Sequence, residues 1–232
     1  MKNSLIITLD GHSACGKSTL AKMLSLKLGY KYIDTGAMYR AVTLYFYENN
    51  FIDNNGILKI KGLNYLDKIK IEFSELDSNG KSFVKLNGKI VESEIRNLTI
   101  SNLVSEVSKY KLIRKKMVHI QQSYGAHGGL VMDGRDIGTV VFPSADVKFW
   151  ITASTETRAN RRLAEMLDNG VDVEFNDVLE NITRRDFEDQ NRKESPLLKP
   201  IAAVEIDNSN LSISQTLDLA MNHVNSILNK KP

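Results

Sequence analysis

The sequence predicts an α/β fold in which helices flank a parallel sheet, and three observations support this prediction. Short apolar runs that resemble buried strands alternate along the chain with longer segments of helical periodicity. This alternation is typical of a parallel sheet covered on both faces. The first apolar run, residues 5–9, leads through Asp10 into a glycine-framed segment that helical spacing follows. A chain of 232 residues, 42% of them hydrophobic, can also bury one sizeable core.

The individual elements follow from the same patterns. Five apolar segments are predicted as the strands of the sheet: residues 5–9, 32–34, 130–133, 147–151 and 203–206. Apolar positions at helical spacing predict helices at residues 20–28, 36–46, 95–122, 155–167, 175–191 and 212–228. The sequence contains no internal repeat and no low-complexity segment.

Residues 64–94 have a different character from the rest of the chain. Polar and apolar residues alternate over 69–73, and a second extended stretch covers 83–91. Turn residues occur at 77–80 and again at Asn87-Gly88, a dipeptide typical of tight hairpins. We therefore predict a small antiparallel sheet inserted into the α/β chain.

The segment between the first strand and the first helix matches the pattern GxxxxGK[ST]. In this context, with a strand before it and a helix after it, the pattern predicts a loop that cradles phosphate groups. Backbone N–H groups and the helix N-terminus would face the phosphates, Lys17 would reach the β- and γ-phosphates, and Ser18 would hold Mg²⁺. The candidate ATP-binding residues are Gly11, His12, Ser13, Ala14, Cys15, Gly16, Lys17, Ser18 and Thr19.

The third predicted strand ends in an acidic residue, Asp133, with Arg135 and Asp136 directly behind it. Phosphate-loop proteins often place an acid near Mg²⁺ at this position, so Asp133 is a candidate metal ligand through water. A helix N-cap or a turn residue is the alternative. Because open α/β sheets bind ligands at the carboxyl ends of their strands, we expect Arg135 to contact an anion.

Two predicted helices carry groups of arginines. Arg158, Arg161 and Arg162 lie close together before Gly170, which suits a mobile flap over phosphates, although a solvated helix is the alternative. Arg185, Asp189 and Arg192 share one helix face, where an intrahelical ion pair is the simpler interpretation. The combination with the other groups favours a sugar or phosphate site.

Composition excludes several classes of protein. A net charge of +3 that is spread along the chain does not favour nucleic-acid binding. One cysteine and four histidines provide neither a disulfide framework nor the spacing of a metal site. With neither a signal peptide nor an apolar stretch long enough to span a membrane, we expect a cytoplasmic protein without membrane contact.

Taken together, these residues resemble the cytidylate kinase family, that is, the CMP/dCMP kinases. The most specific segment is Asp133-Gly-Arg-Asp-Ile-Gly-Thr-Val-Val-Phe-Pro143. The resemblance extends along the whole chain, through the phosphate loop, residues 34–40 (DTGAMYR), 94–96 (EIR), 184–192 and 211–213. It implies a P-loop NTPase fold of the nucleoside monophosphate (NMP) kinase type.

The resemblance also implies a domain organisation and an activity. The core would comprise residues 1–39, 120–153 and 173–232, the NMP-binding domain residues 40–119 with the β insert, and a helical LID residues 154–172. The activity would be transfer of the γ-phosphoryl group of ATP to CMP and dCMP, with Mg²⁺, by a monomer that acts in pyrimidine metabolism. Small-molecule nucleotides would be its partners, without nucleic acid.

Roles follow for the positions that match the family's motifs. Ser105, Arg114 and Asp136 would read the cytosine, and Arg40 would bind the CMP phosphate, with Thr35 nearby. The CMP-binding set implied by the resemblance is Thr35, Arg40, Ser105, Arg114, Arg135, Asp136, Arg185, Asp189 and Arg192. Lys17, Arg135, Arg158 and Arg162 would be catalytic, and Arg161 would contact ATP.

The chain departs from the family pattern in two regions. Relatives commonly have Gly-Pro-Ser-Gly in the loop, whereas here His12 replaces the proline and Ala14 the second glycine. Ala14 would restrict the backbone if that position needs a positive φ angle. Glu188 and Gln190 replace arginines found in some relatives, which reduces the local positive charge.

Two alternative functions fit the sequence less well. A phosphate-loop kinase for another nucleoside monophosphate is the nearer one, and the Asp133–Asp136 segment argues against it. A nucleotide-dependent switch or an RNA-binding module is the more distant one. A guanine switch usually carries an [NT]KxD motif, which is missing here, and the chain has no stripe of basic and aromatic residues.

Overall fold

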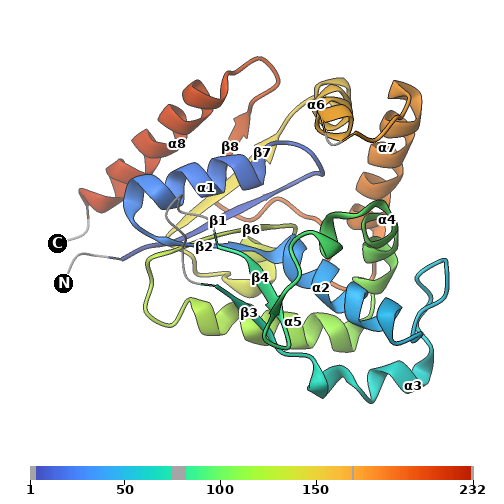
Figure 1. Cartoon of the computed structure of the whole chain (residues 1–232). Helices are drawn as coiled ribbons and strands as arrows, with labels where there is room; N and C mark the ends of the chain where they lie inside the picture. Colours follow the sequence, from blue (N-terminus) through green and yellow to red (C-terminus); the bar gives the residue numbers. More distant parts are fainter. Residues whose placement is uncertain (1–3, 75–81, 169, 231–232) are drawn as a thin grey trace. The chain divides into compact units, whose positions relative to one another are not determined.

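A computed structural model describes residues 4–74, 82–168 and 170–230 of the chain (Figure 1). The described residues form two compact units. The first unit combines Met1–Tyr32 with His127–Pro232, and the second unit is Ile33–Ala126.

The main sheet has five strands in the order β2-β6-β1-β7-β8. The strands are β1 (Ile6–Gly11), β2 (Lys31–Asp34), β6 (Leu130–Gly134), β7 (Val147–Thr152) and β8 (Val204–Asp207). Strand β1 pairs in parallel with β6 on one side, where Ile6 is opposite Leu130, and with β7 on the other, where Ile7 is opposite Val147. β8 pairs in parallel with β7. All five predicted strands are confirmed.

Helices α1 (Lys17–Leu28) and α8 (Ile213–Leu228) pack together on one face of this sheet (Figure 1). Alternate residues of β1, among them Ile7 and Leu9, enter the core that these helices cover. Thr8 and Asp10 alternate with them and are also fully buried. Because successive side chains of a strand point to opposite faces, these two polar residues face away from α1 and α8.

Helices α6 (Thr155–Asp168) and α7 (Phe175–Asn191) lie side by side, coloured orange in Figure 1. Their small shared core is formed by Ala159, Val178 and Ile182. Both helices were predicted with nearly the observed bounds. The sequence did not predict the π-helical turn Ile137–Val141 that follows β6.

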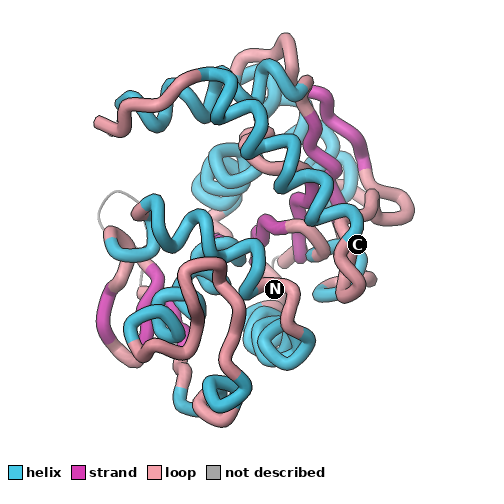
Figure 2. The backbone as a smooth tube through the Cα atoms, turned by 90° about the vertical axis from the view of Figure 1, so that its right-hand side faces the viewer, coloured by secondary structure: helices cyan, strands magenta, loops and turns pink. Residues whose placement is uncertain are grey.

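The second unit is largely helical and carries one small sheet (Figure 2). Its elements are α2 (Thr35–Glu48), α3 (Ile60–Leu63), β3 (Ile71–Phe73), β4 (Val84–Leu86), β5 (Lys89–Ile90), α4 (Leu98–Val107) and α5 (Lys111–Tyr124), with 3-10 turns at Leu66–Lys68 and Glu94–Arg96. Strand β4 pairs antiparallel with both β3 and β5, which confirms the predicted small sheet. The predicted turn at 77–80 lies outside the described residues.

The Asn87-Gly88 turn between β4 and β5 has φ angles of 50° and 85°. Two successive positive φ angles suit the tight hairpin that the dipeptide predicted.

The prediction of one helix over residues 95–122 is wrong. The structure divides this stretch into a 3-10 turn, α4 and α5, because the chain leaves the helical path between Val107 and Lys111. The Arg114 side chain donates a hydrogen bond to the Ser108 carbonyl at this break, with an Nη1–O distance of 3.1 Å. Apolar spacing continues across the break, so periodicity alone did not reveal it.

Candidate functional site

The predicted phosphate loop runs from the end of β1 to the start of α1 in the first unit. At Gly11 the backbone has a φ of 150°, and a β-carbon there would lie 2.0 Å from the Ile151 carbonyl oxygen. Only glycine fits so close to β7. Ala14, which replaces a glycine of the family pattern, adopts a φ of 58° and so lies in the left-handed region.

Lys17, the first residue of α1, is buried beneath this loop. Its ammonium group donates to the His12 carbonyl oxygen at 2.5 Å and to the Cys15 sulfur at 3.4 Å. Burial lowers the pKa of Lys17, because the surrounding protein solvates a charge less well than water. Two groups of the loop, the His12 carbonyl and the Cys15 sulfur, therefore hold the ammonium group in place.

Ser18 and Asp133 meet beside the lysine. The Ser18 hydroxyl donates to Asp133 Oδ2 at 2.8 Å, and the Tyr32 hydroxyl donates to Oδ1 at 2.7 Å. A hydroxyl and a carboxylate beside a phosphate loop fit Mg²⁺, which binds few protein oxygens and completes its shell with phosphates and water. Among the described residues there is no cluster of three or more His, Cys, Asp or Glu that could hold a metal by itself.

The helix N-cap alternative for Asp133 is wrong, because this residue lies within β6.

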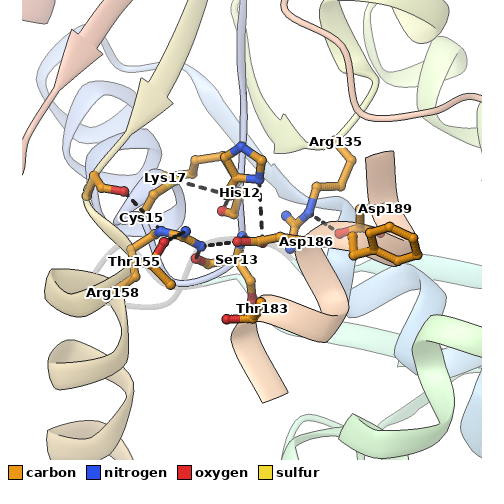
Figure 3. A network of polar contacts seen from close by, with 12 residues as sticks. His12, Ser13, Cys15, Lys17, Arg135, Thr155, Arg158, Thr183, Asp186 and Asp189 are labelled. Carbon is orange, nitrogen blue, oxygen red and sulfur yellow. Dashed lines mark hydrogen bonds and ion pairs between the residues drawn. The ribbon is translucent and has the colours of Figure 1, made fainter. Parts of the chain in front are cut away.

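Arg158 and Asp186 join the loop to helices α6 and α7 (Figure 3). Arg158 Nη1 lies 2.5 Å from Asp186 Oδ2 and 3.3 Å from the Ser13 carbonyl oxygen. Asp186 Oδ1 also accepts from the Ser13 amide at 3.3 Å and lies 3.4 Å from His12 Nδ1. Burial would raise the pKa of Asp186, but its contacts with His12 and Arg158 outweigh that effect and lower it.

The other two arginines of α6 make different contacts. Arg161 donates to the side-chain oxygen and the carbonyl of Asn208, both at 2.9 Å. Asn208 in turn donates to the Cys15 carbonyl oxygen at 2.9 Å, so Arg161 is also connected to the phosphate loop. Arg162 forms an ion pair with Glu165 on its own helix at 2.8 Å.

A second cluster of charges surrounds Asp189 on α7. Arg135 Nε donates to Asp189 Oδ2 at 2.8 Å, and Arg192 Nη1 lies 3.3 Å from Oδ1. Burial opposes the charge of Asp189, but Arg135, Arg192 and Arg185 together lower the pKa of the carboxyl group. The expected ion pair between Asp189 and Arg192 is present, and Asp189 binds Arg135 as well.

Arg192 links this cluster to Asp136. Its Nη2 lies 4.0 Å from Asp136 Oδ1, and both side chains are buried. Its Nε donates to the Ser195 carbonyl oxygen at 2.7 Å. Arg135, Asp136, Asp189 and Arg192 therefore form one connected group in the first unit.

The remaining predicted CMP-binding residues belong to the second unit. Thr35 is buried at the start of α2, whose N-cap residue Asp34 accepts a hydrogen bond from the Ala37 amide at 2.9 Å. Burial would raise the pKa of Asp34, but Arg96 and Arg40 outweigh it and lower the value.

Arg114 and Ser105 lie in the same part of the second unit. The Arg114 guanidinium lies 5.3 Å from the centre of the Tyr39 ring and donates to the Ser108 carbonyl. The Ser108 hydroxyl donates to the Ser105 carbonyl oxygen at 2.9 Å. Ser105, in α4, and Arg114, in α5, thus lie on either side of the break between these helices.

Sequence reasoning did not identify several residues that organise the first unit. Asp10, Tyr32 and Asn208 bind parts of the site through contacts between distant segments of the chain. Asp10 carried one available signal, since a carboxylate in an apolar strand needs buried partners. Asn208 carried no comparable signal.

Comparison with known proteins identifies the family. The sequence model described as Cytidylate kinase matches residues 7–226. The chain is 46% identical over 223 residues to a cytidylate kinase of Flavobacterium psychrophilum, with 96% of this chain and 99% of the relative covered. It is 46% identical over 211 residues to a cytidylate kinase of Bacteroides thetaiotaomicron, covering 91% and 92%.

One solved structure supports the fold. An uncharacterized protein from Eubacterium ventriosum has a TM-score of 0.51 at 10% identity, with 97% of this chain and 99% of that chain covered, a likeness that concerns the fold alone. In the described residues, no helix combines the length and apolar character needed to cross a membrane. The match of the family model over nearly the whole length, together with the identity to these relatives, shows that the chain belongs to the cytidylate kinase family.

Proposed function

We propose that this protein transfers the γ-phosphoryl group of ATP to CMP and to dCMP, forming ADP and CDP or dCDP. The observation that carries the proposal is the 46% identity, over 96% of the chain, to a protein named cytidylate kinase. The buried Lys17 beneath a strand–loop–helix segment supports the donor half of the reaction.

On the donor side, the phosphate loop from Gly11 to Thr19 would bind the ATP phosphates through its backbone. Lys17 would place its positive charge on the β- and γ-phosphates. Ser18, with Asp133 through water, would hold Mg²⁺, which neutralises phosphate charge when bound. Arg158 and Arg162 would add positive charge near the transferred group, and Arg161 would contact ATP.

On the acceptor side, nine residues would bind CMP. Arg40, Arg135 and Arg192 would face the phosphate, and Arg185 and Asp189 would face the sugar. Asp136 would accept from the cytosine N4 amine, while Arg114 and Ser105 would contact the other polar atoms of the ring. Thr35 would lie close to the nucleotide.

The reaction needs no general base, because the CMP phosphate carries negative charge at neutral pH and is itself the nucleophile. The residues would act by aligning two phosphates and by neutralising the charge that develops between them. Closure of residues 154–172 as a LID would exclude water, which would otherwise hydrolyse ATP. We further propose a monomeric cytoplasmic enzyme with the core, NMP-binding and LID divisions predicted above.

A coupled assay of ADP release tests this proposal. CMP, dCMP, UMP, AMP and GMP are each supplied as acceptor with ATP, with and without Mg²⁺. We expect CMP and dCMP to be the preferred acceptors and turnover to require Mg²⁺. Preference for a purine or for UMP would overturn the cytidine assignment, and ADP release independent of any acceptor would indicate an ATPase instead.

A further inference from the structure

Asp10 is a fully buried carboxylate at the end of β1 that the proposed reaction does not use. Its Oδ1 accepts a hydrogen bond from the Ile137 amide, and its Oδ2 accepts one from the Gly138 amide, each at 2.7 Å. Both oxygens of one side chain therefore bind two successive backbone amides more than a hundred positions away in the sequence.

These two amides come directly after Arg135 and Asp136, which belong to the proposed acceptor site. Asp136 is the last residue before the π-helical turn Ile137–Val141, and its carbonyl accepts from the Val140 amide at 2.8 Å. The backbone around Asp136 is thus held on both sides, by the turn itself and by Asp10.

The surroundings of Gly138 leave no room for a side chain at this position. A β-carbon there would lie 2.9 Å from Thr8 Oγ1 and 3.1 Å from Asp10 Oδ2. The turn therefore packs directly against the polar face of β1. Strand β1 is itself held by β6 and β7, with Asp10 opposite Gly134 and Trp150, so the carboxylate has a rigid support.

We propose that Asp10 is a positioning residue for the acceptor nucleotide. Its carboxylate attaches the backbone next to Arg135 and Asp136 to β1, the strand that begins the phosphate loop. This inference rests on the proposed function for the identity of the acceptor. A carboxylate suits the task because it offers acceptors to both amides, whereas an asparagine side chain offers one oxygen and turns a donor toward the other amide.

The variant Asp10→Asn tests the proposal, with Thr8→Val as the matched control. Thr8 lies two residues before Asp10 on the same buried face of β1, and its hydroxyl has no hydrogen-bond partner among the described residues. Valine preserves its shape, so the control disturbs the same place without removing either amide contact.

Three measurements are made on the full chain: the dissociation constants of CMP and of a non-hydrolysable ATP analogue by calorimetry, and the hydrogen exchange of the Ile137 and Gly138 amides. In Asp10→Asn we expect CMP binding to weaken about tenfold, as for loss of a hydrogen bond to a charged group, and both amides to exchange faster. Binding of the ATP analogue should change less than about threefold on the same scale, because Asp186 and Asn208 still hold the loop. Thr8→Val should leave all three unchanged.

Several outcomes would overturn the inference. Equal weakening of CMP and ATP-analogue binding would mean that Asp10 acts on the phosphate loop, and unchanged exchange at Ile137 and Gly138 would mean that it does not hold the turn. If Asp10→Asn does not fold, Gly138→Ala replaces it, since its β-carbon would force the turn away from Asp10, and normal CMP binding there would count against the proposal. If the wild type bound no CMP, the proposed function would fail, while the exchange data would still decide whether Asp10 holds the turn.

Discussion

Arg158 on α6 and Asp186 on α7 form a buried ion pair that also holds the phosphate loop. The guanidinium and the carboxylate are 2.5 Å apart, and each contacts the backbone of Ser13 as well. Two helices and the loop therefore share one pair of charges. Asp189, three residues beyond Asp186 on α7, binds Arg135 and Arg192, so this one helix contacts both the loop and the proposed acceptor arginines.

Replacing Asp186 by asparagine should destabilise the first unit strongly. The substitution leaves the buried Arg158 without its counter-charge, and loss of one partner of a buried pair typically costs about 3–5 kcal/mol. Urea unfolding measures the change in free energy. Arg162→Ala is the control, because the Arg162–Glu165 pair is more exposed and should contribute less than about 1 kcal/mol. Equal effects of the two variants would contradict a special role for the Arg158–Asp186 pair.

Lys17→Ala should reduce phosphoryl transfer at least ~10²-fold, because a preorganised positive charge facing the transferred phosphate contributes a few kcal/mol. Lys17→Arg keeps the charge but not the fit beneath the loop, so it should also be impaired. Initial rates of ADP formation measure the loss, and circular dichroism checks that both variants fold. Near-normal turnover of Lys17→Ala would show that this loop does not bind the transferred phosphate.

Asp136→Asn should weaken the discrimination between CMP and UMP. A carboxylate accepts from the cytosine amine and repels the uracil O4, whereas an asparagine amide can rotate and donate to O4. We expect the ratio of kcat/KM for CMP to that for UMP to shrink by the equivalent of about 1–3 kcal/mol. Steady-state kinetics with both acceptors give this ratio directly.

Equal losses with CMP and UMP would assign Asp136 a different role. In that case its carboxylate would support Arg192, which lies 4.0 Å away, and would not read the base.

The stability of the protein should depend on pH through Asp10. Burial raises the pKa of this carboxyl from 3.8 to about 6, although the Gly138 and Ile137 amides oppose the shift. Between roughly pH 4 and pH 6, the protonated fraction of Asp10 is larger in the native state than in the unfolded state. The contribution of Asp10 to the free energy of unfolding therefore falls as the pH rises. Above pH 6, about where the native carboxyl ionises, the contribution becomes constant.

Urea unfolding measures the stability of the wild type and of Asp10→Asn across this pH range. The difference between the two proteins isolates the contribution of Asp10. The depressed pKa values of Asp186 and Asp189 give the opposite slope, but they are common to both proteins and cancel in the difference. The wild type should lose stability relative to the variant as the pH rises, and a constant difference would contradict the assignment.

Much of the fold could be predicted because its signals are local. The strand–loop–helix segment around Lys17 combines an apolar run, glycines and helical spacing within a short stretch. The capping box of α8, where Ser212 and Gln215 bind each other's backbone amides, is also local, and this helix was predicted to within a residue. The Asn87-Gly88 turn was likewise predicted from two neighbouring residues.

The features that escaped prediction depend on contacts between distant segments. The break between α4 and α5 interrupts a stretch whose apolar spacing is continuous. Asp10 binds amides near residue 137, Asp186 binds the loop at Ser13, and Asn208 binds the Cys15 carbonyl. Nothing in the neighbouring sequence of these residues specifies such partners. The fold was therefore more predictable than the arrangement of the candidate site.

The place of β1 in the sheet has a consequence for how the protein is made. β1 leaves the ribosome before the other strands of its sheet, yet its two neighbours are β6 and β7, which begin at Leu130 and Val147. The entire second unit, Ile33–Ala126, is synthesised in between. At the usual rate of translation this delay is on the order of ten seconds, during which the apolar strand has neither of its native neighbours. Delayed pairing of this kind slows folding and leaves the strand available to chaperones and to aggregation.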